Sequence, residues 1–161
     1  MPLATTGHGP AIRPLGVDGE AGAGIARLFA ATCPELGPAM AADPLERWRA
    51  DERFRPDTLQ LAHDGGRVVG AALVLVLAHT DLEEPTEALL GDLLVDPEAP
   101  VPDRLRRQLL AQALEAGAKA GATVARAIVQ ERDALTRELL ADQLGFEVVD
   151  TIHFYETTLT A

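Results

Sequence analysis

The chain has 161 residues and a mass of 17.1 kDa, which suffices for one domain with a buried core. Apolar residues make up 47% of the sequence and aromatic residues only 4%, so the core must be built mainly from Ala, Leu and Val. The formal net charge of −11 argues against a sequence-independent nucleic-acid binder, which needs a basic surface. The same charge is compatible with a cationic substrate such as an amine, although an acidic surface more often serves solubility alone.

Cysteine usage and hydropathy predict a cytoplasmic protein without a membrane partner. Cys33 is the single cysteine, so no intramolecular disulfide can form, which suits a reducing compartment. Residues 1–10 lack the basic and apolar regions of a signal peptide. The most apolar run, residues 70–78, is far shorter than the roughly 20 residues of a membrane helix. Abundant alanine, and arginine in place of almost all lysine, indicate a GC-rich bacterial gene.

The N-terminal third predicts a flexible start followed by a strand and a helix. Residues 1–10 are rich in Gly, Pro and Thr and are expected to be disordered, with one domain over residues 11–161. Residues 11–15 predict a short strand. An Ala-rich amphipathic helix is expected over residues 18–33, ended by Pro34, with an apolar side formed by Ile25, Leu28 and Phe29.

A loop over residues 34–42 leads to a second helix, expected over residues 43–51. Asp43 can cap this helix, and Pro44 fits its first turn because the missing N–H has no helical partner there. The side chains expected to face the core are Leu45 and Trp48.

Three strands are expected in the middle of the chain. Residues 58–63 alternate in polarity as a strand does, and Asp64-Gly65-Gly66 is typical of a hairpin turn. Residues 67–78 form a nearly continuous apolar run, which indicates a central strand covered on both faces. Residues 87–95 predict a further strand that ends at Asp96-Pro97.

The C-terminal part predicts two helices and three strands. A helix capped by Asp103 is expected over residues 103–121 and a strand over residues 123–129. A closing helix begins at the cap Asp133 and ends at Gly145, where a left-handed residue is needed. Two strands are then expected, over residues 147–149 and 151–158.

The order of these elements resembles that of the GNAT superfamily, the acyl-CoA-dependent N-acyltransferases. Its best local pieces are DGGRVVG at residues 64–70, DLLVDP at residues 92–97 and ADQLGF at residues 141–146. The resemblance implies a single three-layer α/β (α+β) domain. Its mixed, mostly antiparallel sheet would have about six or seven strands, flanked by about four helices.

The resemblance also implies where an acyl-CoA would bind. In that family the pantetheine arm pairs with the strand that corresponds to residues 87–95, and Leu93, Leu94 and Val95 occupy the matching positions. The backbone N–H near Val95 would donate to the thioester oxygen as negative charge builds on it. A simple buried strand would have the same sequence, so this stretch does not separate the two readings.

The family's phosphate-binding loop is replaced here by a loop without glycine, residues 99–105. Pro100 and Pro102 each remove an N–H donor, and Asp103 places a carboxylate near the helix N-terminus. Arginines can compensate as phosphate ligands, or they can form a solvated helix face. The candidate cofactor-binding residues of this stretch are Val101, Asp103, Arg104, Leu105, Arg106 and Arg107.

Candidate catalytic residues are fewer than the family pattern supplies. Its usual tyrosine acid falls on Ala141, so Tyr155, the only tyrosine, is the remaining candidate, or else a core or edge-strand aromatic. Asp92 is the first candidate for the general base and Glu87 the second, and a surface role for Asp92 stays open. No metal is expected, because the histidines of the strands, His63, His79 and His153, lack ligand spacing.

Three functions remain open. The first is acyl transfer from acetyl-CoA or another acyl-CoA to a small amine. The second is a GNAT-like fold that has lost acetyl-CoA chemistry and serves as a ligand-binding or regulatory protein, or runs another reaction in the same cleft. The third is binding of a different anion by Arg104, Arg106 and Arg107. An apolar edge strand would permit a homodimer.

Overall fold

The computed structural model describes residues 9–15, 21–36, 43–79, 81, 83–153 and 155–159. It divides into two compact units, Met1–Ile128 and Val129–Ala161. The expected N-terminal disorder falls mostly outside the described residues, as do the first residues of the expected helix 18–33 and most of the loop 34–42.

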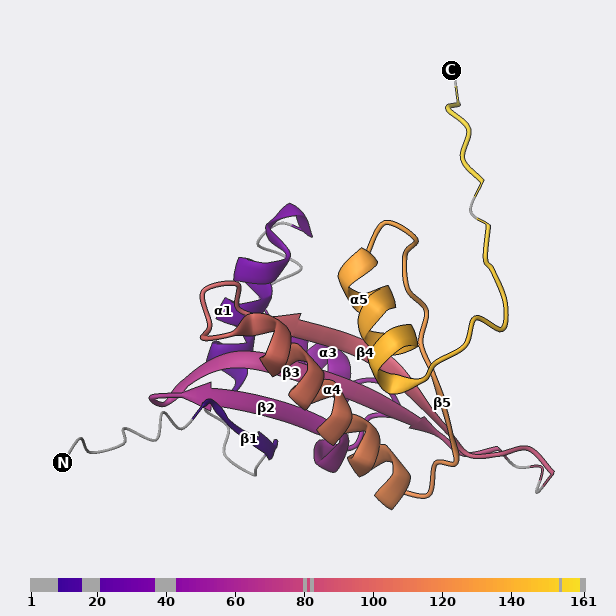
Figure 1. Cartoon of the computed structure of the whole chain (residues 1–161), viewed down its shortest axis with the longest axis horizontal. Helices are drawn as coiled ribbons and strands as arrows, with labels where there is room; N and C mark the ends of the chain where they lie inside the picture. Colours follow the sequence, from indigo (N-terminus) through magenta and orange to yellow (C-terminus); the bar gives the residue numbers. More distant parts are fainter. Residues whose placement is uncertain are drawn as a thin grey trace. The chain divides into compact units, whose positions relative to one another are not determined.

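The first unit is built around a five-stranded sheet whose strands follow one another in chain order (Figure 1). Neighbouring strands are antiparallel except for the last pair, which is parallel. The strands are β1 (Ala11–Pro14), β2 (Leu59–Asp64), β3 (Arg67–Leu77), β4 (Glu87–Val95) and β5 (Val124–Arg126). The helices are α1 (Ala21–Thr32), α3 (Pro44–Arg49) and α4 (Pro102–Lys119), with 3-10 turns at Pro34–Leu36 and Pro56–Thr58.

Two apolar clusters cover the two faces of this sheet. On one face, α1 and α3 pack against alternate residues of β2, β3 and β4, and on the other face α4 packs against the residues between them. The central strand β3 is buried from Val68 to Val76, which confirms the strand covered on both faces. The predicted apolar side of α1 is also confirmed, since Ile25, Leu28 and Phe29 are buried.

Helix α3 begins where its sequence predicts. The Asp43 side chain accepts a hydrogen bond from the Glu46 N–H at 3.2 Å, and Pro44 occupies the first turn. Leu45 and Trp48 point into the core, as expected. After the helix, Asp51 accepts hydrogen bonds from the Arg53 side chain at 2.7 and 2.9 Å, and the Arg53 carbonyl accepts from the Val76 N–H at 3.1 Å. These contacts attach the end of α3 to β3.

Strand β4 has two irregularities. Opposite Leu73 and Val74 of β3 the register shifts, so that Gly91 is an extra residue between Leu90 and Asp92. On its other side, β4 pairs with β5 only from Glu87 to Leu89. Beyond this point the described residues leave that edge of β4 unpaired.

The second unit contains α5 (Ala134–Glu138), which continues as a π-helical turn over Leu139–Gln143. Asp133 caps the helix by accepting from the Thr136 N–H at 3.2 Å, and Gly145 is left-handed with φ of 74°, so both predicted ends are confirmed. The Phe146 N–H bonds to the Leu140 carbonyl at 2.9 Å. This bond spans one residue more than the usual helix-ending bond, because the last turn is the wider π type.

The two strands expected over residues 147–149 and 151–158 are wrong for the described residues, which show no strand there. The sheet accordingly has five strands, slightly fewer than expected. A run of β-forming residues becomes a strand only when a neighbouring strand supplies its hydrogen bonds, and composition does not reveal that neighbour. Separately, none of the described helices is long and apolar enough to cross a membrane.

Close packing between α4 and β3 gives the first prediction. A Cβ added at Gly70 would lie 2.5 Å from Leu109 Cδ1 and 3.4 Å from Ala62 Cβ, both in the core. Gly70→Ala is therefore expected to lower the free energy of unfolding by about 1–3 kcal/mol, measured by urea denaturation. The control Gly9→Ala, which meets no atom within 4 Å, should change it by less than about 0.5 kcal/mol. Equal stability of both variants would contradict the packing argument.

Candidate active site

The unpaired edge of β4 presents backbone amides to an incoming chain. The Asp96 N–H donates to the Val69 carbonyl of β3 at 2.9 Å. Hydrogen-bonded and non-hydrogen-bonded pairs alternate along an antiparallel ladder. The backbone N–H of Leu94 therefore points to β3, whereas the N–H groups of Leu93 and Val95 point to the open edge. An extended ligand with amide groups can therefore pair with β4 as an added strand.

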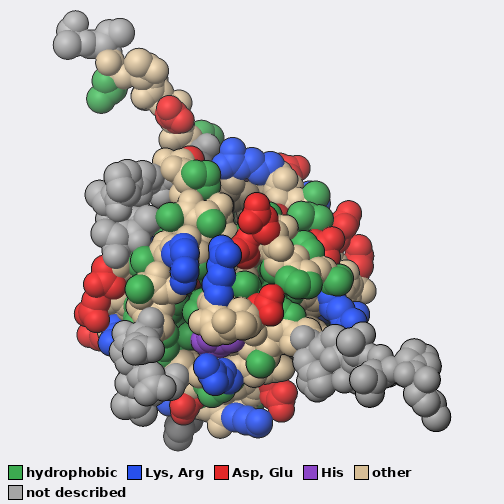
Figure 2. Space-filling model, turned by 90° about the vertical axis from the view of Figure 1, so that its left-hand side faces the viewer, with side chains coloured by type: hydrophobic (Ala, Val, Ile, Leu, Met, Phe, Trp, Pro, Cys, Tyr) green, Lys and Arg blue, Asp and Glu red, His purple; other side chains and the backbone are tan. Residues whose placement is uncertain are grey.

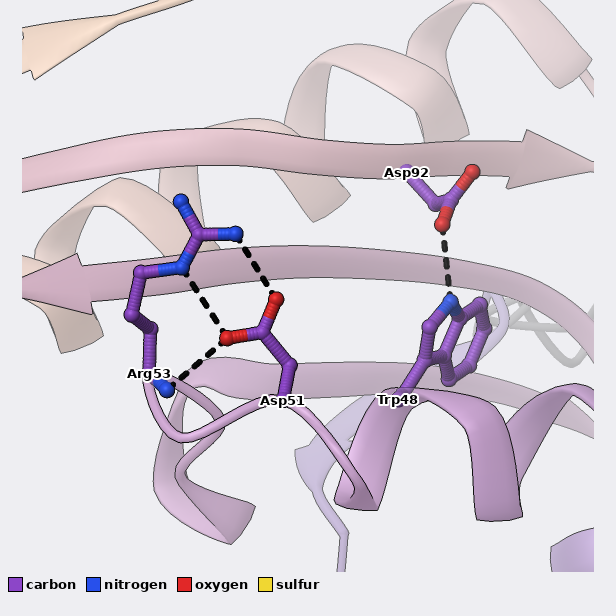
Figure 3. A network of polar contacts seen from close by, with 4 residues as sticks. All are labelled: Trp48, Asp51, Arg53 and Asp92. Carbon is purple, nitrogen blue, oxygen red and sulfur yellow. Dashed lines mark hydrogen bonds and ion pairs between the residues drawn. The ribbon is translucent and has the colours of Figure 1, made fainter.

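Asp92 lies on this same segment, and its carboxylate is held from across the fold. Trp48 Nε1 donates a hydrogen bond of 2.8 Å to Asp92 Oδ2 (Figure 3). The register places the Asp92 side chain on the face of the sheet that α1 and α3 cover, together with Leu94. The bulge at Gly91 sets this orientation, because without the extra residue Asp92 would point to the opposite face.

Burial is the main influence on the ionisation of Asp92. Desolvation raises the pKa of its carboxyl above the usual value of 3.8, while the Trp48 hydrogen bond and the nearby Arg47 charge act in the opposite direction. The raised pKa makes the ionised carboxylate a better proton acceptor than a solvated aspartate. This combination of geometry and environment suits a general base.

Glu87, the second candidate base, occupies the other end of β4. Its carboxylate forms an ion pair of 2.8 Å with Arg126 of β5, and its side chain is only 16% exposed. The register puts Glu87 on the same face of the sheet as Asp92. Because Glu87 lies on the paired part of β4, the ion pair links the two strands at the point before the open edge begins.

The loop that follows β4 is tied down by its own side chain. Asp96 is 6% exposed, accepts from the Glu98 N–H at 2.9 Å and contacts Arg67 at 3.3 Å. At the end of the loop Val101 adopts a left-handed conformation with φ of 45°. A β-branched residue rarely takes this conformation, so the backbone of Val101 is strained.

The cap predicted at Asp103 is wrong. Helix α4 begins at Pro102, with Val101 as its N-cap and no side-chain capping bond. A proline favours the first helical position, so it moves the start one residue ahead of Asp103. The Asp103 carboxylate instead pairs with Arg106 at 3.0 Å within the first turn.

The remaining loop and helix residues do not form a closed phosphate cradle. Arg104 and Arg107 are exposed and make no ion pair among the described residues. Leu105, on the inner side of α4, is buried in the core. In Figure 2, which looks onto the side where β4 connects to α4 in Figure 1, basic and acidic side chains are interspersed rather than gathered by sign. Any phosphate binding here would depend on flexible arginines.

The remaining candidates are Tyr155 and the histidines. Tyr155 belongs to the second unit, is 94% exposed and lies outside any strand. His79 contacts Glu84 at 2.9 Å, and within the described ranges no group of three His, Cys, Asp or Glu side chains could hold a metal. A solvent-open hollow of about 300 Å³ lies between α1 and α3, and none of the predicted site residues lines it.

Trp48 is the residue of this site that sequence reasoning placed only in the core. Its neighbour in the site, Asp92, is 44 residues away in the chain, and no local pattern connects the two. One signal was available: a buried indole N–H needs a hydrogen-bond acceptor, and an isolated tryptophan on an amphipathic helix must find it on another element.

Comparison with known proteins places this geometry in a known fold. No family model matches the chain, and a search of curated proteins finds no match. Solved structures do match. The aminoglycoside N-acetyltransferase AAC(6')-Iy in complex with CoA shares 16% identity with a TM-score of 0.72, over 98% of this chain and 100% of that one.

Two further structures show the range of names attached to this fold. An aminoglycoside acetyltransferase from an uncultured soil metagenomic sample, in complex with sisomicin, shares 17% identity with a TM-score of 0.69, over 93% of this chain and 97% of that one. A transcriptional regulator from Bacillus halodurans shares 15% identity with a TM-score of 0.67, over 92% and 99%. The chain thus has the GNAT acetyltransferase fold.

Strain at Val101 gives a prediction about stability. Glycine adopts the left-handed conformation without the penalty of about 1–2 kcal/mol, and it costs roughly 0.5–1 kcal/mol more chain entropy on folding. Because Val101 is 63% exposed, little burial is lost, and Val101→Gly should raise the free energy of unfolding by about 0.5–1 kcal/mol. Chemical denaturation measures this change. Val101→Ala keeps a Cβ and should gain less, and a destabilised glycine variant would contradict the strain argument.

The raised pKa of the partly buried Asp92 carboxyl gives a prediction about pH. Since its pKa is raised in the folded state, the native protein retains a proton that the unfolded chain releases above pH 3.8, and stability falls as pH rises through this window. Asp92→Asn removes that penalty while its Oδ1 can still accept from Trp48. The variant should therefore melt at a higher temperature than wild type at pH 7.5, with the difference shrinking toward pH 4. Thermal melting of both proteins at several pH values measures this difference. A difference that stays constant from pH 4 to pH 7.5 would contradict a raised pKa of Asp92.

Proposed function

We propose that this chain is an N-acyltransferase that moves an acyl group from acyl-CoA to a small amine. The observation that carries the proposal is the coincidence, on one segment of β4, of outward backbone amides and a partly buried carboxylate. Leu93 and Val95 supply the amides, and Asp92 supplies the carboxylate. The fold by itself would not suffice, because one fold hosts many activities.

The proposed reaction needs three things from the protein. The amine nitrogen attacks the thioester carbonyl carbon, the C–S bond breaks, and the thiolate of CoA leaves. Asp92 accepts the proton that the amine loses, directly or through water. The outward N–H of Val95 donates to the carbonyl oxygen as it becomes negative. The proton that the thiolate finally takes comes from solvent.

The site offers more binding groups to the pantetheine arm of acyl-CoA than to its pyrophosphate. The amide-rich pantetheine arm matches the unpaired edge at Leu93 and Val95, since both can exchange backbone hydrogen bonds. The pyrophosphate finds fewer donors, because Pro100 and Pro102 have no N–H. Arg104 and Arg107, exposed at the start of α4, are the candidate phosphate ligands. We therefore expect affinity for the pyrophosphate to be carried by side chains.

A specific observation favours a second candidate function. The strained, glycine-free turn at Val101 lacks the successive N–H groups that bind phosphates in a cradle. The fold also occurs in a protein described as a transcriptional regulator. A chain that kept the fold and lost acyl-CoA binding would act as a binding or regulatory protein.

Calorimetric titration with acetyl-CoA, with free CoA as comparison, separates the two functions. Dissociation constants in the micromolar range support the acyltransferase, and amines are then screened, aminoglycosides first because a similar structure holds sisomicin. Absence of heat at millimolar acetyl-CoA would overturn the acyltransferase and favour the second function.

The role of Asp92 gives a prediction about turnover. Loss of a general base typically costs about 10²–10⁴-fold in rate, so Asp92→Asn should lower kcat by at least roughly 100-fold. Its affinity for acetyl-CoA should stay close to that of wild type, because Asp92 is not among the groups expected to hold acetyl-CoA. Asp64→Asn, which changes an exposed carboxylate at the end of β2, is the matched control and should keep full activity. Wild-type turnover in Asp92→Asn would remove Asp92 from the mechanism.

A further inference from the structure

The indole of Trp48 connects the packed core to the candidate base. Trp48 is 9% exposed and lies in the apolar cluster between α1, α3 and the sheet. Its one polar side-chain atom, Nε1, donates to Asp92 Oδ2 at 2.8 Å, and the carboxylate accepts no other hydrogen bond from a described residue. Figure 3 shows this oxygen turned toward the indole and the other oxygen turned away from it.

We infer that Trp48 is a positioning residue for acyl transfer: its indole N–H fixes Asp92 through Oδ2 and leaves Oδ1 as the atom that accepts the proton of the amine. This inference rests on the proposed function and names the group that gives its base a fixed direction. Trp48 itself is not assigned a contact with either substrate.

The position of the indole is fixed at both ends of α3. Asp43 caps the start of the helix, and the pair of Asp51 and Arg53 follows its end. The bond from the Val76 N–H to the Arg53 carbonyl then fastens that turn to β3, the strand next to β4. The helix that carries the Trp48 donor is thus attached to β3, and the Asp92 acceptor lies on the neighbouring strand β4. These attachments limit the relative motion of the two groups.

The second carboxylate oxygen of Asp92, Oδ1, has no hydrogen-bond partner among the described residues. Among the described residues, the only fully enclosed side-chain polar atom without a partner is Nδ1 of His63. Asp92 is only partly buried, and its Oδ1 makes no hydrogen bond to another described residue. A base needs this arrangement, with one oxygen held and one oxygen reachable.

Besides burial, the Trp48 hydrogen bond is a main influence on the pKa of Asp92. Arg47 of α3 acts on it electrostatically, and Glu87 on its own strand is paired with Arg126. The residues of the other elements that share this cluster are apolar, namely Ile25, Leu28 and Phe29 of α1, Leu59 and Leu61 of β2, and Leu73 and Leu75 of β3. Removing the indole donor leaves desolvation less opposed, which raises the pKa of Asp92 further.

The first test reads the hydrogen bond without any substrate. Trp48 is the only tryptophan, so excitation of indole fluorescence reports on this residue alone. Titration of the full chain should show a fluorescence transition at a pH above the usual 3.8 of aspartate, and Asp92→Asn should abolish it. A transition unchanged in Asp92→Asn, or no transition between pH 4 and pH 8, would overturn the inference.

The second test measures whether Trp48 orients Asp92 for the reaction. In the acetyl-CoA and amine assay, Trp48→Phe should lower kcat by roughly 10- to 100-fold, as loss of an orienting group does. It should also move the acid limb of the pH–rate profile to higher pH, which a purely structural role would not do. An unmoved acid limb in a folded Trp48→Phe protein would overturn the positioning role and leave the acyltransferase intact.

Two further results separate the inference from the function on which it rests. If wild type turns over no amine, the proposed function fails, and the inference fails with it even where the fluorescence transition is present. If Trp48→Phe does not fold, Trp48→His, which keeps an aromatic ring with an N–H donor, replaces it. A folded Trp48→His protein that keeps turnover with the wild-type acid limb supports positioning, and a folded Trp48→His protein that has lost turnover opposes it.

Discussion

Strand β5 ends at Arg126, and the unpaired edge that this leaves on β4 is the feature on which the other parts of the candidate site depend. Had β5 continued along β4, the amides of Leu93 and Val95 would be used within the sheet. The ion pair of Glu87 and Arg126 stands at the last stretch where the strands are joined. A short strand thus converts an interior strand into a strand with an available edge, at the cost of unpaired backbone groups that water or a ligand must satisfy.

Asp92 shows how stability and chemistry compete at one position. A carboxylate partly buried beside an apolar cluster is costly, and a single hydrogen bond from Trp48 and the charge of Arg47 offset only part of that cost. The same side chain of Trp48 fills the core and directs the carboxylate, so changes in core packing will be felt in the site. The coupling arises because Asp92 lies on the face of β4 that α1 and α3 cover.

Signals between neighbouring residues predicted much of the fold, whereas features that depend on distant strand partners could not be predicted in this way. The caps at Asp43 and Asp133 and the left-handed Gly145 depend on a few neighbouring residues, and the sequence predicted all three. The start of α4 was misplaced by one residue, because Pro102 outweighs Asp103 as a signal for the first turn.

The candidate site was predictable only in part. Its strand and its acidic residues follow from the pattern of residues 87–95, whereas the open edge depends on where β5 ends, and the Trp48 contact joins residues 44 positions apart. The expected C-terminal strands depended on partners in the same way. Propensity describes what a segment can form, and tertiary contacts decide what it does form.

The C-terminal segment has a consequence for handling the protein in solution. Its exposed side chains include Val148, Val149, Ile152, Tyr155 and Leu159, a composition typical of strands that associate between molecules. From residue 138 onward the chain has no lysine or arginine, and its acidic residues are Glu138, Asp142, Glu147, Asp150 and Glu156. Mutual repulsion of these carboxylates opposes self-association at neutral pH. Toward the sequence pI of about 4.7 that repulsion fades, and the colloidal stability of concentrated solutions falls with it.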